Sequence, residues 1–317
     1  MFKKISILGI FALFILLLAA APASAHNGGI YPADNLTDAM KGDFNDYLIP
    51  QNTTKNLVII HGHGFEYDFG NITTPLDVTV VAPDGTKTVL KTQSVTEQID
   101  DIQLGTKKPL VYQKTSYNFT QSGTYFVYAT LPGANATTAT ELMKTAIYVG
   151  TNTWSDWNKN LGLPLEFTMY TRMSSISGGD VMHARLNYGN GTGASDIMYY
   201  VEPVKTAAEA KAMYDMLVSD YPTGEDIYLI YSQRSSTDGS GDLVSTVPES
   251  GVWSIVAAAT VDGVPYKATY IFPALPPIYG DAGTSAPAPA PEKETPGFGV
   301  LLGLLAVVGA VLLIRRK

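Results

Sequence analysis

The residues Ser122-Gly123-Thr124-Tyr125-Phe126-Val127-Tyr128-Ala129 contain the pattern that decides the fold, a glycine turn followed at once by a strand-forming run. Aromatic and β-branched side chains favour strands because they pack well on a pleated surface. The pattern returns 128 residues later as Ser250-Gly251-Val252-Trp253-Ser254-Ile255-Val256-Ala257. In each copy the first aromatic residue of the run is placed to plug the end of a β-sandwich. The repeat therefore predicts two related β-domains.

Further strand-like runs surround the first copy, and they lie at residues 57–60, 76–82, 86–90, 110–117 and 145–149. Pro83-Asp84-Gly85-Thr86 supplies a turn between two of them, which predicts a hairpin over 76–90. Few stretches show helical periodicity, so the economical architecture is all-β, with two sandwich domains. Strand character lapses near 154–163, and we place the domains at 26–155 and 156–275.

One helix interrupts the second domain. Thr206-Ala207-Ala208-Glu209 is a capping box, and apolar residues follow it at helical spacing. The pattern predicts an inserted helix over residues 207–219, with its apolar face packed on a sheet.

The N-terminal 25 residues have the organisation of a secretory signal peptide. Lys3 and Lys4 precede an apolar run over 5–21, and Ala23-Ser24-Ala25 fits the small-x-small cleavage rule. Cleavage after Ala25 makes His26 the first residue of the mature chain. An uncleaved N-terminal anchor is the alternative, because the apolar run is long for a signal peptide.

The C-terminal residues predict a stalk followed by a membrane segment. Residues 276–296 are rich in Pro, Ala and Ser and are expected to be extended. In 297–317 an apolar stretch over 298–314 ends in Arg315-Arg316-Lys317, which predicts a cytoplasmic tail and an external remainder. Pro296-Gly297-Phe298, the apolar run and the basic cluster together resemble the archaeal PGF-type C-terminal sorting signal. This resemblance implies a cell-surface protein that an archaeosortase cuts and transfers to a lipid, whereas the alternative is a plain anchor helix in the cytoplasmic membrane.

Composition narrows the function. The 317 residues include no cysteine, which excludes disulfides, thiolate metal sites and a cysteine nucleophile. The net charge is -8, and five of the 21 basic residues lie in the two apolar ends, so the middle carries 16 basic residues against all 29 acidic ones. So acidic a chain is not expected to bind nucleic acid.

Six N-x-[ST] motifs exceed the number expected by chance, and they begin at Asn35, Asn52, Asn71, Asn118, Asn135 and Asn190. In a secreted chain they predict N-linked glycans. A composition that is merely rich in Thr is the alternative for any single motif.

Four histidines, His26, His61, His63 and His183, are the most informative polar residues. A mature N-terminal His26 offers its α-amine and its ring to one ion. His61 and His63 follow a strand-like run at i, i+2 spacing, which places both imidazoles on one face. Glu66 and Asp68 lie just beyond and offer oxygen ligands.

We therefore predict a metal site made of His26, His61, His63 and Glu66. Nitrogen-rich ligation without thiolates fits Cu(II), Ni(II) or Zn(II) better than Mg or Ca. The alternative is that His61 hydrogen-bonds a strand end and that His26 lies in a disordered terminus. His183 lies in a strand-like run and is expected to be an ordinary sheet residue.

Several further motifs occur in a characteristic order, namely Ala25-His26, Gly62-His63-Gly64-Phe65-Glu66, Leu161-Gly162-Leu163-Pro164-Leu165-Glu166, Gly179-Asp180, and Thr237-Asp238 through Gly251-Val252-Trp253. Over about residues 26–272 this order resembles an uncharacterised extracytoplasmic β-sandwich family formerly labelled the NikM-type subunit of nickel uptake complexes. The resemblance implies two Ig-like, carrier-type sandwich domains, the second similar to carrier-type Ig-like modules, and a role with nickel, cobalt or copper at the cell surface. His63 and Glu66 fall on the matching motif.

Two functions are consistent with these patterns. The first is a surface-anchored protein that captures a Ni, Co or Cu ion and passes it to a membrane transporter. The second is a structural or adhesive glycosylated envelope protein without a metal. No G-x-S-x-G elbow, H-E-x-x-H helix or phosphate-binding glycine loop occurs, and we do not expect an enzyme.

Overall fold

The computed structural model describes residues 26–151, 156–220 and 233–277. The predicted signal peptide, the stalk beyond residue 277 and the C-terminal segment 297–317 lie outside these ranges. The strands are β1 (Asn27–Tyr31), β2 (Leu48–Ile49), β3 (Thr53–His63), β4 (Asp68–Gly70), β5 (Asp77–Val81), β6 (Lys87–Lys91), β7 (Gln93–Asp101), β8 (Thr106–Phe119), β9 (Gly123–Leu131), β10 (Thr140–Val149), β11 (Leu165–Met169), β12 (Val181–Tyr188), β13 (Met198–Pro203), β14 (Gln233–Ser236), β15 (Asp242–Thr246), β16 (Gly251–Val261) and β17 (Val264–Ala274). The helical elements are α2 (Leu36–Ala39), α3 (Ala207–Asp220) and the 3-10 turns η1 (Phe44–Tyr47) and η2 (Met173–Ser175).

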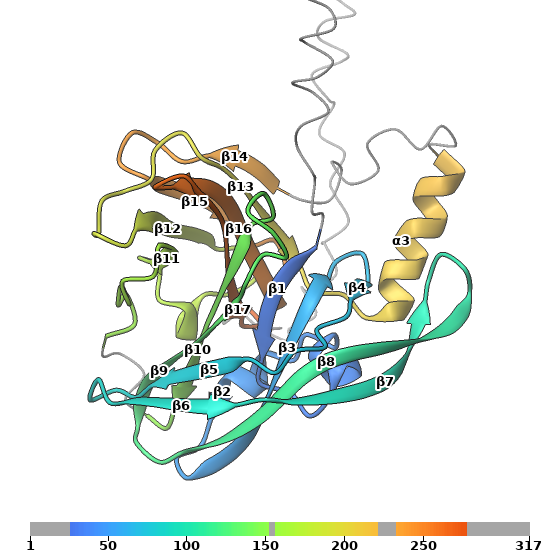
Figure 1. The fold of residues 1–317 in the computed structure, drawn as a ribbon, viewed down its shortest axis with the longest axis horizontal. Coiled ribbons are helices and arrows are strands. Elements are labelled where there is room, and N and C mark those ends of the chain that lie inside the picture. Colours follow the sequence, from blue (N-terminus) through green and yellow to red (C-terminus); the bar gives the residue numbers. More distant parts are fainter. Residues whose placement is uncertain (1–25, 152–155, 221–232, 278–317) are drawn as a thin grey trace, which may run out of the picture. The chain divides into compact units, whose positions relative to one another are not determined.

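The described strands form three sheets that pack face to face, which confirms the predicted all-β sandwich class (Figure 1). One sheet has the order β1-β3-β8-β7, with β4 paired to β3. A second has the order β14-β13-β16-β17-β10-β9-β5-β6, with β2 paired to β10. The third has the order β11-β12-β15. Apolar clusters fill the space on both faces of the second sheet, so this sheet is the shared wall of the sandwiches.

Strand β10 joins the two halves of the chain. It pairs in parallel with β17, with Thr140 opposite Tyr266 and Thr145 opposite Ile271, and antiparallel with β9. The boundary predicted at 155 falls in the connection between β10 and β11. The halves on either side of it share one continuous sheet and one compact unit, and the division into two folding domains stays a prediction.

The repeated glycine-aromatic pattern forms two equivalent corners. Gly123 and Gly251 both have positive φ, of 141° and 135°, so each turn favours glycine. The buried Tyr125 accepts a hydrogen bond through its hydroxyl from the amide of Gln121, and the buried Trp253 donates one from Nε1 to the carbonyl of Glu249. In both copies the ring is tied to the backbone four residues upstream, which explains the echo in the sequence.

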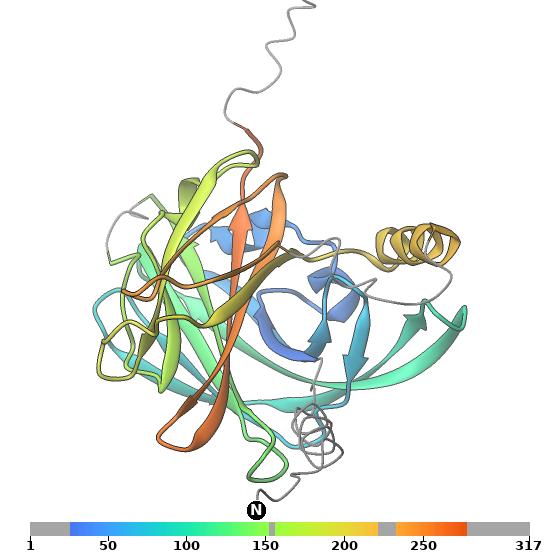
Figure 2. The same cartoon turned by 90° about the horizontal axis from the view of Figure 1, so that it is seen from above.

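Helix α3 begins at the predicted residue and ends one residue beyond the predicted end. Its capping box is complete, because the amide of Thr206 donates to Glu209 and the amide of Glu209 donates back to Thr206 Oγ1. The helix lies to one side of the sheets, next to the tip of the β7–β8 hairpin (Figures 1 and 2). β7 was absent from the predicted strands because polar residues dominate it.

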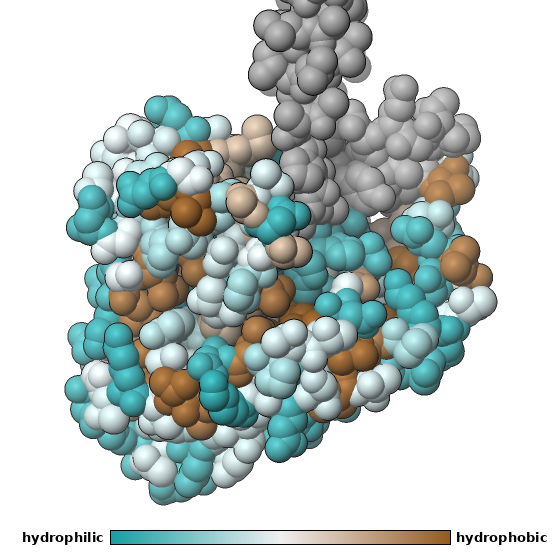
Figure 3. Space-filling view, viewed as in Figure 1, coloured by the Kyte–Doolittle hydropathy of each residue, from teal (hydrophilic) through white to brown (hydrophobic). Residues whose placement is uncertain are grey.

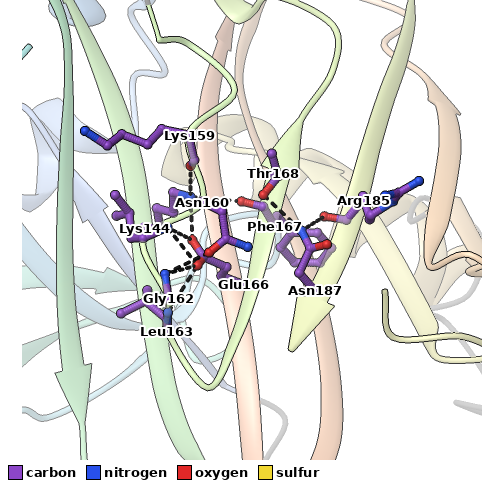
Figure 4. Close-up of polar contacts among 11 residues, drawn as sticks. Lys144, Lys159, Asn160, Gly162, Leu163, Glu166, Phe167, Thr168, Arg185 and Asn187 are labelled. Atoms are coloured by element: carbon purple, nitrogen blue, oxygen red, sulfur yellow. Dashed lines mark hydrogen bonds and ion pairs between the residues drawn. The ribbon is translucent and has the colours of Figure 1, made fainter. Parts of the chain in front are cut away.

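A buried ion pair fixes the connection that enters β11 (Figure 4). Lys144 Nζ lies 2.7 Å from Glu166 Oε2 and donates to two backbone carbonyls, those of Lys159 and Phe167. Glu166 also accepts hydrogen bonds from consecutive backbone amides, at residues 161–163. Every charge here is paired and hydrogen-bonded, as buried charges must be if they are to be tolerated.

Apolar side chains are scattered among polar ones on the face shown in Figure 3. Within the part of the chain that the structure describes, no helix is long and apolar enough to cross a membrane.

Candidate metal centre

Pairing of β3 with β1 and β4 assembles the histidines. His61 lies opposite Gly28 of β1 and Gly70 of β4, and His63 lies opposite Asp68. His26 directly precedes β1. Because side chains alternate between the faces of a strand, these positions share one face of the sheet.

The three imidazoles lie close together. The ring centroids of His26 and His61 are 5.2 Å apart, and those of His26 and His63 are 5.9 Å apart. Gly70 permits this approach, since a β-carbon there would lie 3.1 Å from Nδ1 of His26 and 3.2 Å from Nδ1 of His61. Two ring nitrogens therefore face the same backbone position.

A carboxylate accompanies each ring. Nε2 of His26 lies 3.0 Å from Asp68, and Nε2 of His61 lies 3.1 Å from Glu141 of β10. Nδ1 of His63 faces Glu202 of β13 at 3.6 Å, which is longer than a normal hydrogen bond. The cluster thus lies where the β1–β3–β4 edge meets the second sheet.

Two buried polar atoms of this cluster lack a hydrogen bond, namely Nδ1 of His63 and Oε2 of Glu141. Unsatisfied buried polar groups are costly and uncommon, so each of these atoms is suited to interact with a ligand. The side chains of Glu141 and Glu202 are only 5% and 7% exposed, so solvent does not readily satisfy them.

The pKa values of several groups in this cluster are shifted by burial and by their neighbours. Burial raises the pKa of Glu66 to about 7, in opposition to the nearby His63. The hydrogen bond from His26 lowers the pKa of Asp68 to about 2. Burial works to lower the pKa of His63, but the carboxylate of Glu202 outweighs it and the pKa is raised. Four carboxyl groups therefore surround the imidazoles.

Two lysines offset part of that negative charge. Lys267 Nζ lies 3.8 Å from Glu141 Oε1 and donates to the carbonyl oxygen of His26 at 2.6 Å. Burial lowers the pKa of Lys267. Lys108 lies at 3.4 Å from Asp68. The lysine contact to His26 also fixes the position of the first described residue.

The predicted ligands fall in one place. His26, His61 and His63 converge, and Glu66 lies in the β3–β4 loop, within electrostatic range of His63 and His26. His183 is remote in the topology, because it lies on β12, packs against Tyr170 and faces Asp242 at 3.8 Å.

Glu141, Glu202 and Gly70 were missed from sequence. Glu141 and Glu202 lie in strands far from the histidines along the chain, and their only signal is a carboxylate inside a largely buried strand. In the described ranges, no three His, Asp or Glu side chains already stand as a group that could hold a metal ion. The imidazoles are gathered, and one nitrogen of each ring faces a carboxylate, namely Nε2 of His26, Nε2 of His61 and Nδ1 of His63.

The fold and the C-terminal residues together define a β-sandwich protein of the cell surface. The PGF-CTERM motif matches residues 295–317, which confirms the predicted sorting signal and indicates a protein anchored at the archaeal membrane or envelope. The chain belongs to the family described as Domain of unknown function (DUF4198), whose model matches residues 43–261. No curated protein matches the chain.

Solved structures with partial likeness are much larger or only distantly similar. Salmonella alpha-2-macroglobulin is 13% identical over 81% of this chain and 15% of its own, with a TM-score of 0.23. Alpha-2-macroglobulin of Escherichia coli is 12% identical over 80% of this chain and 14% of its own, with a TM-score of 0.24. The ectodomain of mouse nectin-like molecule 4 is 9% identical over 73% of this chain and 62% of its own, with a TM-score of 0.19. TM-scores this low do not establish a shared overall fold.

Proposed function

We propose that the mature protein binds one transition-metal ion, Ni(II), Co(II) or Cu(II), through His26, His61 and His63 with Glu66, and passes it to a membrane transporter. The observation that carries this proposal is the convergence of three imidazoles among carboxylates with unsatisfied buried atoms. An archaeosortase-processed lipid anchor would hold the protein beside such a transporter. The resemblance of the sequence motifs to a family formerly labelled NikM-type is consistent with this role.

The carboxylate next to each histidine indicates which of its two ring nitrogens would bind the ion in this proposal. Metal-binding histidines commonly donate their second N–H to a carboxylate, which fixes the tautomer and leaves the other nitrogen free. Asp68 and Glu141 engage Nε2 of His26 and His61, so Nδ1 of each is the metal-binding atom. Glu202 faces Nδ1 of His63, which leaves its Nε2 for the ion.

A chain that begins at His26 adds a fourth nitrogen. The α-amine and Nδ1 of the same residue close a six-membered chelate ring on one ion. The contact from Lys267 to the His26 carbonyl orients this residue toward the cluster. Four nitrogens suit Cu(II) or Ni(II) better than a hard cation such as Ca(II).

Binding requires a small closing movement. Nitrogen ligands lie about 2.0–2.1 Å from a bound zinc ion, and similar divalent ions are comparable. Nδ1 of His26 and Nδ1 of His61 lie 3.1 and 3.2 Å from the position that a β-carbon of Gly70 would take, and we propose that the two rings turn until both nitrogens reach one ion. The surrounding carboxylates favour this step, because a divalent ion neutralises charge that the lysines leave uncompensated.

The test is a metal titration of protein processed to begin at His26. We expect one Ni(II) or Cu(II) ion per chain in wild type, and no binding in His61→Ala/His63→Ala. His183→Ala is the matched control, since it removes a strand histidine remote from the cluster, and it is expected to bind as wild type does. An unchanged titration of the double variant would refute the proposal.

The alternative is a structural or adhesive envelope protein that carries glycans and no metal. Five of the six sequon asparagines are exposed in the structure, and Asn35 is half-buried. Failure of wild type to bind any transition metal, together with recovery of envelope proteins in a pull-down, would favour this function.

A further inference from the structure

A second site lies away from the histidines, in a cavity of about 640 Å³ that shares no residue with them. Its walls come from the turn after β12, the segment before β11 and the β16–β17 hairpin. The lining residues include Tyr188, Asn190, Thr260, Asp262 and Tyr266. The volume lies within the range of about 300–1,000 Å³ that is typical of small-molecule sites.

The chemistry of this cavity suits a sugar. Tyr188 and Tyr266 pack against the apolar core and so present ordered aromatic surface. Thr260 and Asp262 are exposed and offer a hydroxyl and a carboxylate to hydroxyl groups of a ligand. Aromatic walls with a few polar groups are the usual means of binding a ligand that has both apolar and hydroxyl-bearing faces.

Asn190 at the rim of the cavity is itself a glycosylation motif, Asn190-Gly191-Thr192. Its Oδ1 accepts a hydrogen bond from the Thr192 amide at 2.9 Å, and Gly191 holds the turn with a φ of 82°. Nδ2, the atom that a glycan joins, makes no hydrogen bond with the described residues, and the side chain is exposed.

We propose that Asn190 carries an N-linked glycan and that the cavity holds the first sugars of that same glycan. In the modification, Asn190 Nδ2 bonds to C1 of a lipid phosphate-linked oligosaccharide. The C1–O bond to the phosphate breaks, the phosphate leaves with the electron pair, and the amide loses one proton. The proposal is independent of the metal site.

Because the glycan is attached to Asn190 beside the cavity, only a few contacts are needed to hold its first sugars there. An open cavity with few polar groups binds a free sugar weakly, because association costs translational and rotational entropy. A sugar attached next to the cavity binds intramolecularly, at an effective concentration of the order of mM. Because the glycan is covalently attached, the cavity is occupied even though its affinity for a free sugar is low.

Two other motifs provide internal controls. Asn135 is exposed and forms the same turn, with Oδ1 accepting from the Thr137 amide at 2.9 Å, but it does not line the cavity. Asn35 donates from Nδ2 to Asp38 at 2.7 Å and caps a helix, so its amide is engaged. We expect glycans on Asn190 and Asn135 and none on Asn35.

The experiment uses the full chain secreted by an archaeal host that glycosylates its surface proteins. Glycopeptide mass spectrometry gives the occupancy of each asparagine. Hydrogen exchange then compares wild type with Thr192→Ala, which removes the Asn190 motif, and with Thr137→Ala, which removes the Asn135 motif. We expect exchange over residues 260–266 to be at least about threefold faster in Thr192→Ala and unchanged in Thr137→Ala.

Thr192→Ser keeps the motif and is expected to restore both the glycan and the slow exchange. This variant separates loss of the glycan from damage to the turn. An unmodified Asn190 in protein that is modified at Asn135 would overturn the proposal. A modified Asn190 with unchanged exchange over 260–266 would overturn it equally.

Discussion

The Lys144–Glu166 ion pair and the histidine cluster lie on opposite faces of strand β10, and they differ in how completely their polar atoms are hydrogen-bonded. On one side Lys144 and Glu166 are 3% and 1% exposed and make a full set of hydrogen bonds. On the other side His26, His61 and His63 are 27%, 22% and 10% exposed, and polar atoms among them lack partners. A satisfied cluster stabilises a fold, whereas an unsatisfied and partly open one is suited to receive a ligand.

Strand β10 produces this separation through its alternation. Leu142 and Ala146 face the same apolar cluster as the strands of the second half, on the side of Lys144. Met143 and Ile147 face the opposite cluster, on the side of Glu141. A single strand therefore contributes a structural ion pair to one sandwich and a carboxylate to the candidate metal centre of the other.

The largest expected effect comes from Glu166→Ala. Removing the carboxylate leaves Lys144 buried without its counter-charge, which costs about 3–5 kcal/mol of the free energy of unfolding. Chemical denaturation measures this loss. Asp215→Ala is the control, because its pair with Lys211 is about half exposed and is worth only about 0.3–0.5 kcal/mol. Equal effects of the two variants would contradict the structural role of Glu166.

Gly70→Ala tests the candidate metal centre without removing a ligand. The added β-carbon meets Nδ1 of both His26 and His61, so the rings lose the space through which they approach one ion. We expect metal affinity to fall about 10–100-fold, as for disruption of groups that orient ligands, with little change in stability. Gly239→Ala is the control, since nothing lies within 4 Å of its β-carbon position. Wild-type affinity in Gly70→Ala would place the ion elsewhere.

The smallest effect is expected from Asp68→Asn, because this side chain is 43% exposed. Its pKa is lowered to about 2 by His26, below the usual value near 3.9, so the group stabilises the fold above the unfolded-state pKa. That contribution is lost as pH falls from about 4 toward 2. Stability measured against pH is therefore expected to fall slightly less steeply over this window in Asp68→Asn. Identical profiles would show that His26 does not hold the carboxylate.

Much of the fold was predictable because local signals agreed with it. The turn at Gly85, the capping box at Thr206 and the corners at Tyr125 and Trp253 each specify their own geometry. The continuity of the second sheet was not predictable, because the parallel pairing of β10 with β17 joins residues more than 120 positions apart. β7 was missed because its alternation is polar.

In the candidate metal centre too, local spacing was predictable from the sequence and long-range packing was not. The i, i+2 spacing of His61 and His63 predicted a shared face, and pairing of β1 with β3 brings His26 beside them. Glu141 and Glu202 reach the cluster only through packing of one sheet on another, which no spacing in the sequence encodes. Gly70 matters because it has no β-carbon that would crowd the two imidazoles. A glycine in a short strand does not reveal in the sequence which side chains lie next to it.

The most direct test of the central claim is X-ray absorption spectroscopy on mature protein loaded with one equivalent of Ni(II) or Cu(II). We expect a nitrogen shell at about 2.0–2.1 Å, with the outer-shell scattering of two or more imidazoles, and we expect both to be lost in His61→Ala/His63→Ala. A shell of oxygen atoms without imidazole scattering, or a chain that retains no ion, would contradict it.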